Sequence, residues 1–119
     1  MDSIKIEGLW VETHIGATEA ERAEVQPVLL DLEIEADLRT ASTSDELEDT
    51  IDYAQVTTLV AELVAEKNVK LLEHLAGEIA EAVLALQGVR AVSVQIAKET
   101  PPVGENVRNI AVRIERSRS

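Results

Sequence analysis

The sequence predicts an α+β protein in which two helices cover one face of an antiparallel sheet. Apolar residues alternate with polar ones along four segments, and they recur at three-and-four spacing along two segments in between. The chain has 119 residues, of which 45% are hydrophobic. We therefore expect a single domain over residues 1–119 that buries roughly two-thirds of the surface exposed by its unfolded form.

The first two strands follow from the alternation near the N-terminus. An early segment carries Ile4 and Ile6 and then Leu9 and Val11, and residues 17–26 after it are expected to be loop. The next strand runs from Val28 to Leu38 with one apolar and one wet face. Its apolar residues are Val28, Leu30, Leu32, Ile34, Ala36 and Leu38.

Two amphipathic helices are predicted in the middle of the chain. Asp52 is placed to cap the first, whose apolar stripe runs from Val56 to Val64. The second carries apolar residues from Leu72 to Leu86, and Gly88 stands where a helix often ends in a left-handed residue. Asn68 is expected to help the chain turn between them.

Two further strands are predicted at residues 92–96 and 110–114, and Pro101 and Pro102 end the first of them. The order strand, strand, helix, helix, strand, strand predicts a four-stranded antiparallel sheet with both helices on one face. The acidic residues of the second strand must then face water on the other side. These residues are Asp31, Glu33, Glu35 and Asp37.

That wet face leaves two arrangements open. Sheets of several subunits could join into a barrel, which removes the exposed strand edges. The alternative is a two-layer monomer whose outer face is simply solvated.

Composition narrows the classes of function. With 23 acidic and 11 basic residues the net charge is -12, which argues against nucleic acid and anionic membranes as partners. The chain has no cysteine, so disulfides and thiolate chemistry are excluded. The start lacks a signal peptide and no run of about 18 apolar residues occurs, so we expect a cytoplasmic protein. His14 and His74 form no standard metal motif, and no metal or cofactor is expected.

Glu73 and Lys98 are the first candidates for a functional site. Glu73 stands near a helix start beside Leu72 and Leu75, where we expect partial shielding from water. A carboxylate there can accept two parallel hydrogen bonds from a guanidine-like heterocycle edge. Lys98 ends a strand, which suits an acid or base. The ordinary alternatives, which the residues alone favour, are a first-turn glutamate stabilised by the helix dipole and an edge-strand lysine that blocks aggregation.

Tyr53 and Glu21 are weaker candidates. Tyr53 is the last residue of the segment 48–53, at the start of the first helix. A lone tyrosine ordinarily packs its ring against other side chains and exposes its hydroxyl to water. Glu21 is one of three glutamates in its segment, with Glu19 and Glu24, and nothing local distinguishes it from them. Taken singly, it is a solvated residue.

The four candidates together resemble the dihydroneopterin aldolase family of bacterial type, in order and in local context. The resemblance covers nearly the whole chain, from Ile4 to Arg116. The segments that carry it are His14-Ile-Gly-Ala followed by Glu21, Asp49-Thr-Ile-Asp-Tyr53, Leu71-Leu-Glu-His-Leu-Ala, and Ile96-Ala-Lys-Glu-Thr-Pro-Pro.

The resemblance implies a tunnelling fold, in which subunits join their sheets into a barrel and two rings commonly stack into an octamer. It implies that Glu73 anchors the pterin's amino-pyrimidinone edge with the backbone of Leu72. Tyr53 would enter from the adjacent subunit, and Lys98 would be the principal acid–base residue, working with Tyr53 and Glu21.

The implied reaction is a retro-aldol cleavage of 7,8-dihydroneopterin in folate biosynthesis. It yields 6-hydroxymethyl-7,8-dihydropterin and glycolaldehyde without a metal or a Schiff base, with 2′-epimerase activity on the side. The chain departs from the family at Glu99, where many relatives carry proline, and in the polar segment 104–109. The alternatives are a dihydroneopterin triphosphate epimerase, a related enzyme that also oxidises dihydroneopterin, and a non-catalytic acidic oligomeric scaffold.

Overall fold

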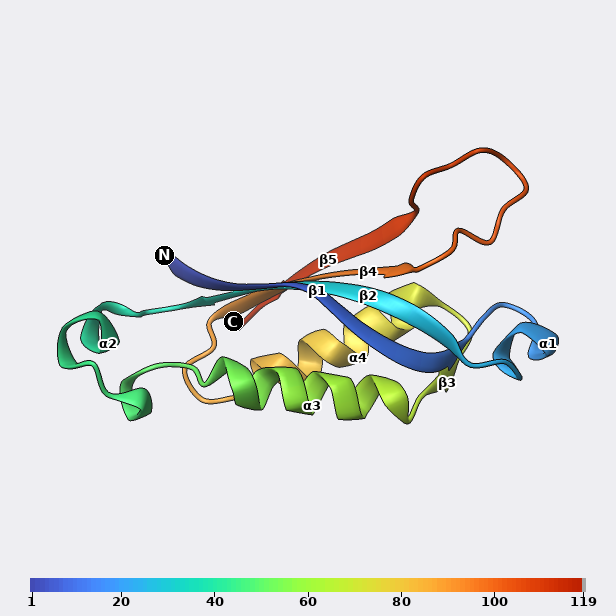
Figure 1. The fold of residues 1–119 in the computed structure, drawn as a ribbon. Helices are drawn as coiled ribbons and strands as arrows, with labels where there is room; N and C mark the ends of the chain where they lie inside the picture. The colour runs from blue at the N-terminus through green and yellow to red at the C-terminus, as the bar shows by residue number, and fades with distance from the viewer. Residues whose placement is uncertain (119) are drawn as a thin grey trace.

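The computed structural model describes residues 1–118 and has one sheet whose inner face is covered by two helices (Figure 1). The strand order is β3-β1-β2-β4-β5. The strands are β1 (Asp2–Ile15), β2 (Gln26–Ala36), β3 (Asn68–Val69), β4 (Ala91–Lys98) and β5 (Ala111–Ser117). The covering helices are α3 (Tyr53–Ala65) and α4 (Leu72–Leu84), and short turns form α1 (Glu19–Arg22), α2 (Arg39–Ser44) and the 3₁₀ helix η1 (Leu47–Asp49).

The prediction of four strands was wrong, because the sheet has a fifth. Asn68 and Val69 form β3, which pairs in parallel with His14 and Ile15 at the end of β1. Asn68 is therefore part of a strand rather than a turn. Two residues between two helices carry no visible alternation, so the sequence gives no sign of this pairing.

The polar stretch of residues 17–26, predicted as a loop, contains a short helix. In residues 17–26, Thr18 caps α1 by accepting a hydrogen bond from the Glu21 N–H at 3.1 Å, and Gln26 already belongs to β2. The spacing of Thr18 and Glu21 is that of a capping box, which is the signal that could have predicted α1. Between β2 and α3, residues 39–44 form α2 and residues 47–49 form η1.

The core is the aliphatic layer between the sheet and the two long helices. The Asp52 side chain accepts hydrogen bonds from the N–H groups of Ala54 and Gln55, which confirms the predicted cap of α3. Gly88 has a φ of 91°, but α4 ends earlier, at Leu84 with Ala85 as its C-cap, so Gly88 lies in the following turn, where the Val89 N–H donates to the Leu86 carbonyl, rather than at the predicted helix end. The fully buried side chains come from β1, β2, β4, α3 and α4 and include Ile15, Leu30, Leu32, Ile34, Val56, Val60, Val64, Leu75, Ile79, Val94 and Ile96.

The acidic residues of the predicted second strand lie off the core side, as expected, although β2 ends at Ala36, before Asp37 and Leu38, and two of the four have local partners. Asp31 accepts a hydrogen bond at 2.8 Å from the N–H of Gly8, where the register of β1 against β2 shifts. Gly8 has a φ of 73°, which favours glycine at this bulge. Asp37 follows the end of β2 and forms an ion pair with Arg39 at 2.7 Å. The hydrogen bonds from Arg39 hold the pKa of that carboxyl far below its usual range.

The corner between α3 and α4 is tied to β1 by Thr13, the polar residue buried in the core. Its Oγ1 lies 2.5 Å from the carbonyl oxygen of Val64 and 3.2 Å from that of Lys67. Lys67 is held in turn by an ion pair with Glu78 on α4. These contacts fix the place where α4 begins.

We predict that Thr13→Val lowers the free energy of unfolding by about 1–3 kcal/mol, because buried carbonyl oxygens lose their donor while the side-chain volume is kept. Denaturant unfolding of the two proteins measures the difference. The matched control is Thr57→Val, whose hydroxyl bonds to Ala54 on the exposed side of α3. Equal effects of the two substitutions would contradict the role of Thr13.

Candidate active site

The ion pair of Lys98 and Glu21 is the centre of the candidate site. Lys98 is the last residue of β4 and pairs with Val28, a fully buried residue, so its side chain lies on the helix-covered side of the sheet. The Lys98 side chain is only 10% exposed, and its Nζ lies 2.7 Å from Glu21 Oε2. β4 lies between β2 and β5, so Lys98 is not the edge-strand lysine of the alternative interpretation.

Glu21 reaches Lys98 because α1 turns the chain back over the end of β1. Oε1 of Glu21 accepts a hydrogen bond at 3.1 Å from the N–H of Ala17, while Oε2 faces Lys98. The flanking turn is fixed by Arg22, whose guanidinium donates to the Gly16 carbonyl at 2.9 Å. The backbone carbonyl of Arg22 accepts a hydrogen bond from Nδ1 of His14 at 2.8 Å.

The Lys98 amine affects the pKa of the Glu21 carboxyl. The hydrogen bond from Lys98 holds the pKa of the Glu21 carboxyl below its ordinary value, although burial acts in the opposite direction. The N–H of Ala17 and the side chain of Gln26 act in the same direction as Lys98. Glu21 is therefore a carboxylate at neutral pH, held against the Lys98 amine. Such a pair can hand a proton to one substrate atom and stabilise positive charge at another.

Glu73 lies at the same end of the molecule, in the first turn of α4, directly after β3 (Figure 1). The prediction that it is partly shielded was wrong, because its side chain is exposed. The buried stripe of α4 begins with Leu75 and Ala76, which turns Glu73 away from the core. Leu72 is half-buried beside it. The N-cap residue Leu71 is apolar and cannot cap, so the first N–H groups of α4 are open to a ligand.

Tyr53 lies at the end of α3 that is far from β3. It starts α3, as predicted, and is 65% exposed. The 13 residues of α3 span about 20 Å, and the helix runs from Tyr53 toward β3 and the start of α4. One chain therefore brings Glu21 and Lys98 into contact and places Glu73 in the first turn of the helix that follows β3, but it does not bring Tyr53 to them.

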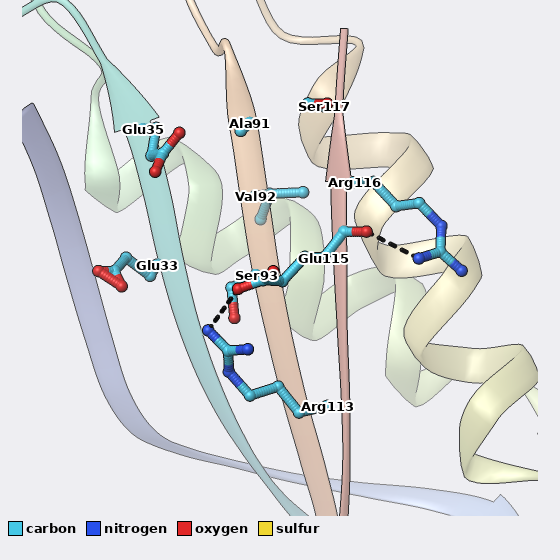
Figure 2. A pocket seen from close by; sticks show the side chains of 9 residues that line it. All are labelled: Glu33, Glu35, Ala91, Val92, Ser93, Arg113, Glu115, Arg116 and Ser117. Atoms are coloured by element: carbon cyan, nitrogen blue, oxygen red, sulfur yellow. Dashed lines mark hydrogen bonds and ion pairs between the residues drawn. The ribbon is translucent and has the colours of Figure 1, made fainter. Parts of the chain in front are cut away.

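Hollows on the described surface lie elsewhere. Figure 2 shows one of about 400 Å³ on the outer face of the sheet, where Ala91 and Ser93 of β4 lie between longer side chains. Glu33 stands on one side, and Arg113 and Glu115, 2.8 Å apart, stand on the other. Another, of about 520 Å³, lies between the end of β2, η1 and Gly88. The four candidate residues line neither hollow.

Residues 1–118 hold no group of three or more His, Asp or Glu side chains arranged to bind a metal ion. His74 contacts Glu78 at 2.7 Å rather than a second histidine. Among the helices of this part of the chain, none is both long and apolar enough to cross a membrane.

Comparison with known proteins gives concordant results. A family model described as dihydroneopterin aldolase matches residues 4–115. The dihydroneopterin aldolase of Streptococcus pyogenes serotype M1 is 37% identical over 119 residues, which cover 99% of this chain and all of that protein.

Two solved structures are also similar. The E. coli dihydroneopterin aldolase in complex with neopterin has a TM-score of 0.90 at 33% identity, covering 98% of this chain and 100% of that chain. A dihydroneopterin aldolase from a Burkholderia species, bound to guanine, has a TM-score of 0.81 at 26% identity, covering 99% of this chain and 92% of that chain.

The lowered pKa of Glu21 predicts how the ion pair contributes to stability as pH changes. A carboxyl whose pKa is lower in the folded than in the unfolded chain contributes stability above the unfolded pKa of about 4.3, and this contribution is lost as pH falls through the folded value. We expect Glu21→Gln to be destabilising by a constant amount between pH 7 and about 5, and the difference to shrink below that. Denaturant unfolding across this range measures it, with Glu24→Gln as the exposed control. A difference that grows toward acid would contradict the assignment.

Proposed function

This chain belongs to the dihydroneopterin aldolase family, and we propose that it cleaves 7,8-dihydroneopterin at a site built from Lys98, Glu21 and Glu73 of one subunit and Tyr53 of the partner subunit. The observation that supports this site most strongly is the shielded Lys98–Glu21 pair at the end of β4. A folate-pathway role in the cytoplasm follows from the family's chemistry.

The retro-aldol cleavage requires proton transfers and no nucleophilic residue of the protein. Loss of the proton from the 2′-hydroxyl turns that oxygen into an aldehyde oxygen as the bond to C1′ breaks. The bonding electrons move into the C=N bond at N5 of the dihydropterin ring. Protonation at C1′ then gives 6-hydroxymethyl-7,8-dihydropterin, and glycolaldehyde leaves. Because the ring already contains the imine, no lysine Schiff base is needed.

Lys98 is the residue that we assign to these proton transfers. Its amine is fixed by the strand and by Glu21, so it can meet the ring without a large loss of side-chain freedom. The ammonium stabilises negative charge that develops near N5, and its proton can return from the substrate hydroxyl. Glu21 holds the amine in place and compensates its charge. Tyr53 supplies a hydroxyl that can relay a proton.

Glu73 suits the opposite end of the substrate. The relatives with solved structures bind neopterin and guanine, which share an aminopyrimidinone edge. That edge carries two parallel N–H donors, and one carboxylate can accept both. The open N–H groups at the start of α4, including that of Leu72, can donate to the ring carbonyl beside them.

The exposed positions of Tyr53 and Glu73 fit a site that is completed by assembly. The long edges of the sheet belong to β1 and β5, and β3 covers only the end of β1. Joining β5 of one subunit to β1 of the next would close a ring. The sheet face that the helices leave uncovered would line the interior of this ring, and two rings could stack. In such a ring Tyr53 of the partner subunit can fill the place that its own chain cannot reach.

Incubating the protein with 7,8-dihydroneopterin tests the function directly. The proposal expects glycolaldehyde and 6-hydroxymethyl-7,8-dihydropterin in equal amounts. Conversion to the 2′-epimer without cleavage would instead identify an epimerase. A parallel incubation with dihydroneopterin triphosphate tests whether that compound is the preferred substrate. Oxidised products would identify an oxygenase, and no conversion at all would leave a scaffold.

We predict that Glu73→Gln weakens the binding of guanine by about 1.5–3 kcal/mol, because one charged acceptor of a paired hydrogen bond is replaced by an amide. Guanine has no side chain to cleave, so calorimetric titration with it reports the anchor separately from catalysis. Glu81→Gln, at an exposed position further along α4, serves as the control. Unchanged affinity in Glu73→Gln would remove the anchor role.

We predict that Lys98→Ala lowers single-turnover cleavage about 10²- to 10⁴-fold while substrate binding changes much less. Lys98→Arg should not restore the rate, since a guanidinium stays protonated. Lys5→Ala, on the exposed outer face of the same sheet, should keep the parent rate. A Lys98→Ala rate within a few-fold of the parent would assign Lys98 a structural role only.

We predict that light scattering reports at least four times the mass of one chain. The assembly should tighten as salt rises, because salt screens repulsion among the carboxylates of the outer face. A fully active monomer would contradict both the ring and the shared site.

A further inference from the structure

Gly16 lies beside the Glu21 side chain of the site, and the sequence analysis named it only as part of the segment His14-Ile-Gly-Ala. It follows the last residue of β1 and is buried. Its N–H donates to the Val69 carbonyl at 3.1 Å, which extends the pairing of β1 with β3. Its own carbonyl accepts the hydrogen bond from Arg22. The backbone of Gly16 is therefore fixed on both sides.

The Glu21 side chain lies directly over the Cα of Gly16. A Cβ added at Gly16 would come well within 3.0 Å of Cγ, Cδ and Oε1 of Glu21, and the three nearest atoms all belong to that one side chain. Real Cβ atoms do not approach other heavy atoms so closely. An alanine at position 16 and the observed position of the Glu21 carboxylate are mutually exclusive.

The backbone at this position does not itself require glycine. The glycines with positive φ are Gly8 and Gly88, so Gly16 lies outside the left-handed region that favours glycine. The obstruction is the end of a flexible side chain rather than backbone, so a methyl group can be accommodated if Glu21 moves. The expected consequence of Gly16→Ala is displacement of one carboxylate, with the fold kept.

We propose that Gly16 is a positioning residue of the site, whose missing Cβ opens the path by which the Glu21 carboxylate reaches both Lys98 and the Ala17 N–H. This rests on the proposed function in one respect, that the Lys98–Glu21 pair serves cleavage. The steric relation holds whatever reaction the pair serves. Gly16 acts on the substrate only through Glu21.

The first test needs no substrate. With ¹³C-labelled glutamate, the carboxyl signal of Glu21 is assigned by its loss in Glu21→Gln and is followed as a function of pH. In the parent chain, contact with Lys98 lowers the titration midpoint, helped by Ala17 and Gln26. In Gly16→Ala the midpoint should rise to that of an ordinary glutamate, while the circular dichroism spectrum stays that of the parent. An unchanged midpoint in Gly16→Ala overturns the proposal.

The second test is a double-mutant cycle on turnover. Gly16→Ala should lower kcat by the same factor as Glu21→Ala, about tenfold or more for a lost hydrogen bond between charged groups. In the Glu21→Ala background the same glycine substitution should cost nothing, because the side chain that it displaces is gone. A loss that persists in that background would assign Gly16 a structural role and overturn the proposal.

Gly104→Ala is the matched control, because a Cβ added there meets nothing within 4 Å. It should leave both the Glu21 titration and kcat unchanged. If the parent chain shows no cleavage at all, the proposed function fails, and the carboxyl titration still decides the role of Gly16.

Discussion

The ion pair between Lys98 and Glu21 depends on the register of the central strands. Pairing of Lys98 with Val28 turns the amine toward the helix side, and a shift by one residue would send it to the outer face. Glu21 reaches it only because β1 ends one residue before Gly16 and α1 folds back. The pairing of β1 with β3 fixes that end, and the same two-residue strand sets the start of α4. The ends of β1, β3 and β4 thus position the Lys98–Glu21 pair and the start of α4.

Much of this arrangement could be predicted from the sequence. Period-two alternation identified the strands because their inner residues are uniformly aliphatic, and Asp52 identified the start of α3 by its capping chemistry. The site residues were identified by resemblance to a family, since each of them alone has an ordinary structural interpretation. The Thr18 cap, and with it α1, could have been predicted from spacing alone.

Other features could not be predicted, for physical reasons. β3 is too short to show a period, and its pairing with β1 is a long-range contact. The exposure of Glu73 depends on which face of α4 packs against the sheet. The apolar residues of the helix indicate that face only approximately. The steric role of Gly16 depends on a side chain five residues later folding back over it, which no local pattern encodes.

We propose that the site is shared between subunits, with Lys98 from one and Tyr53 from its neighbour. Mixing Lys98→Ala and Tyr53→Ala chains after dissociation, then allowing reassembly, tests it most directly. Each variant alone should be nearly inactive. In a random equal mixture about one site in four receives both intact residues, so we expect about a quarter of the parent activity. If the mixture stayed as inactive as its components while forming mixed rings, both residues would have to come from the same chain, and the account would be wrong.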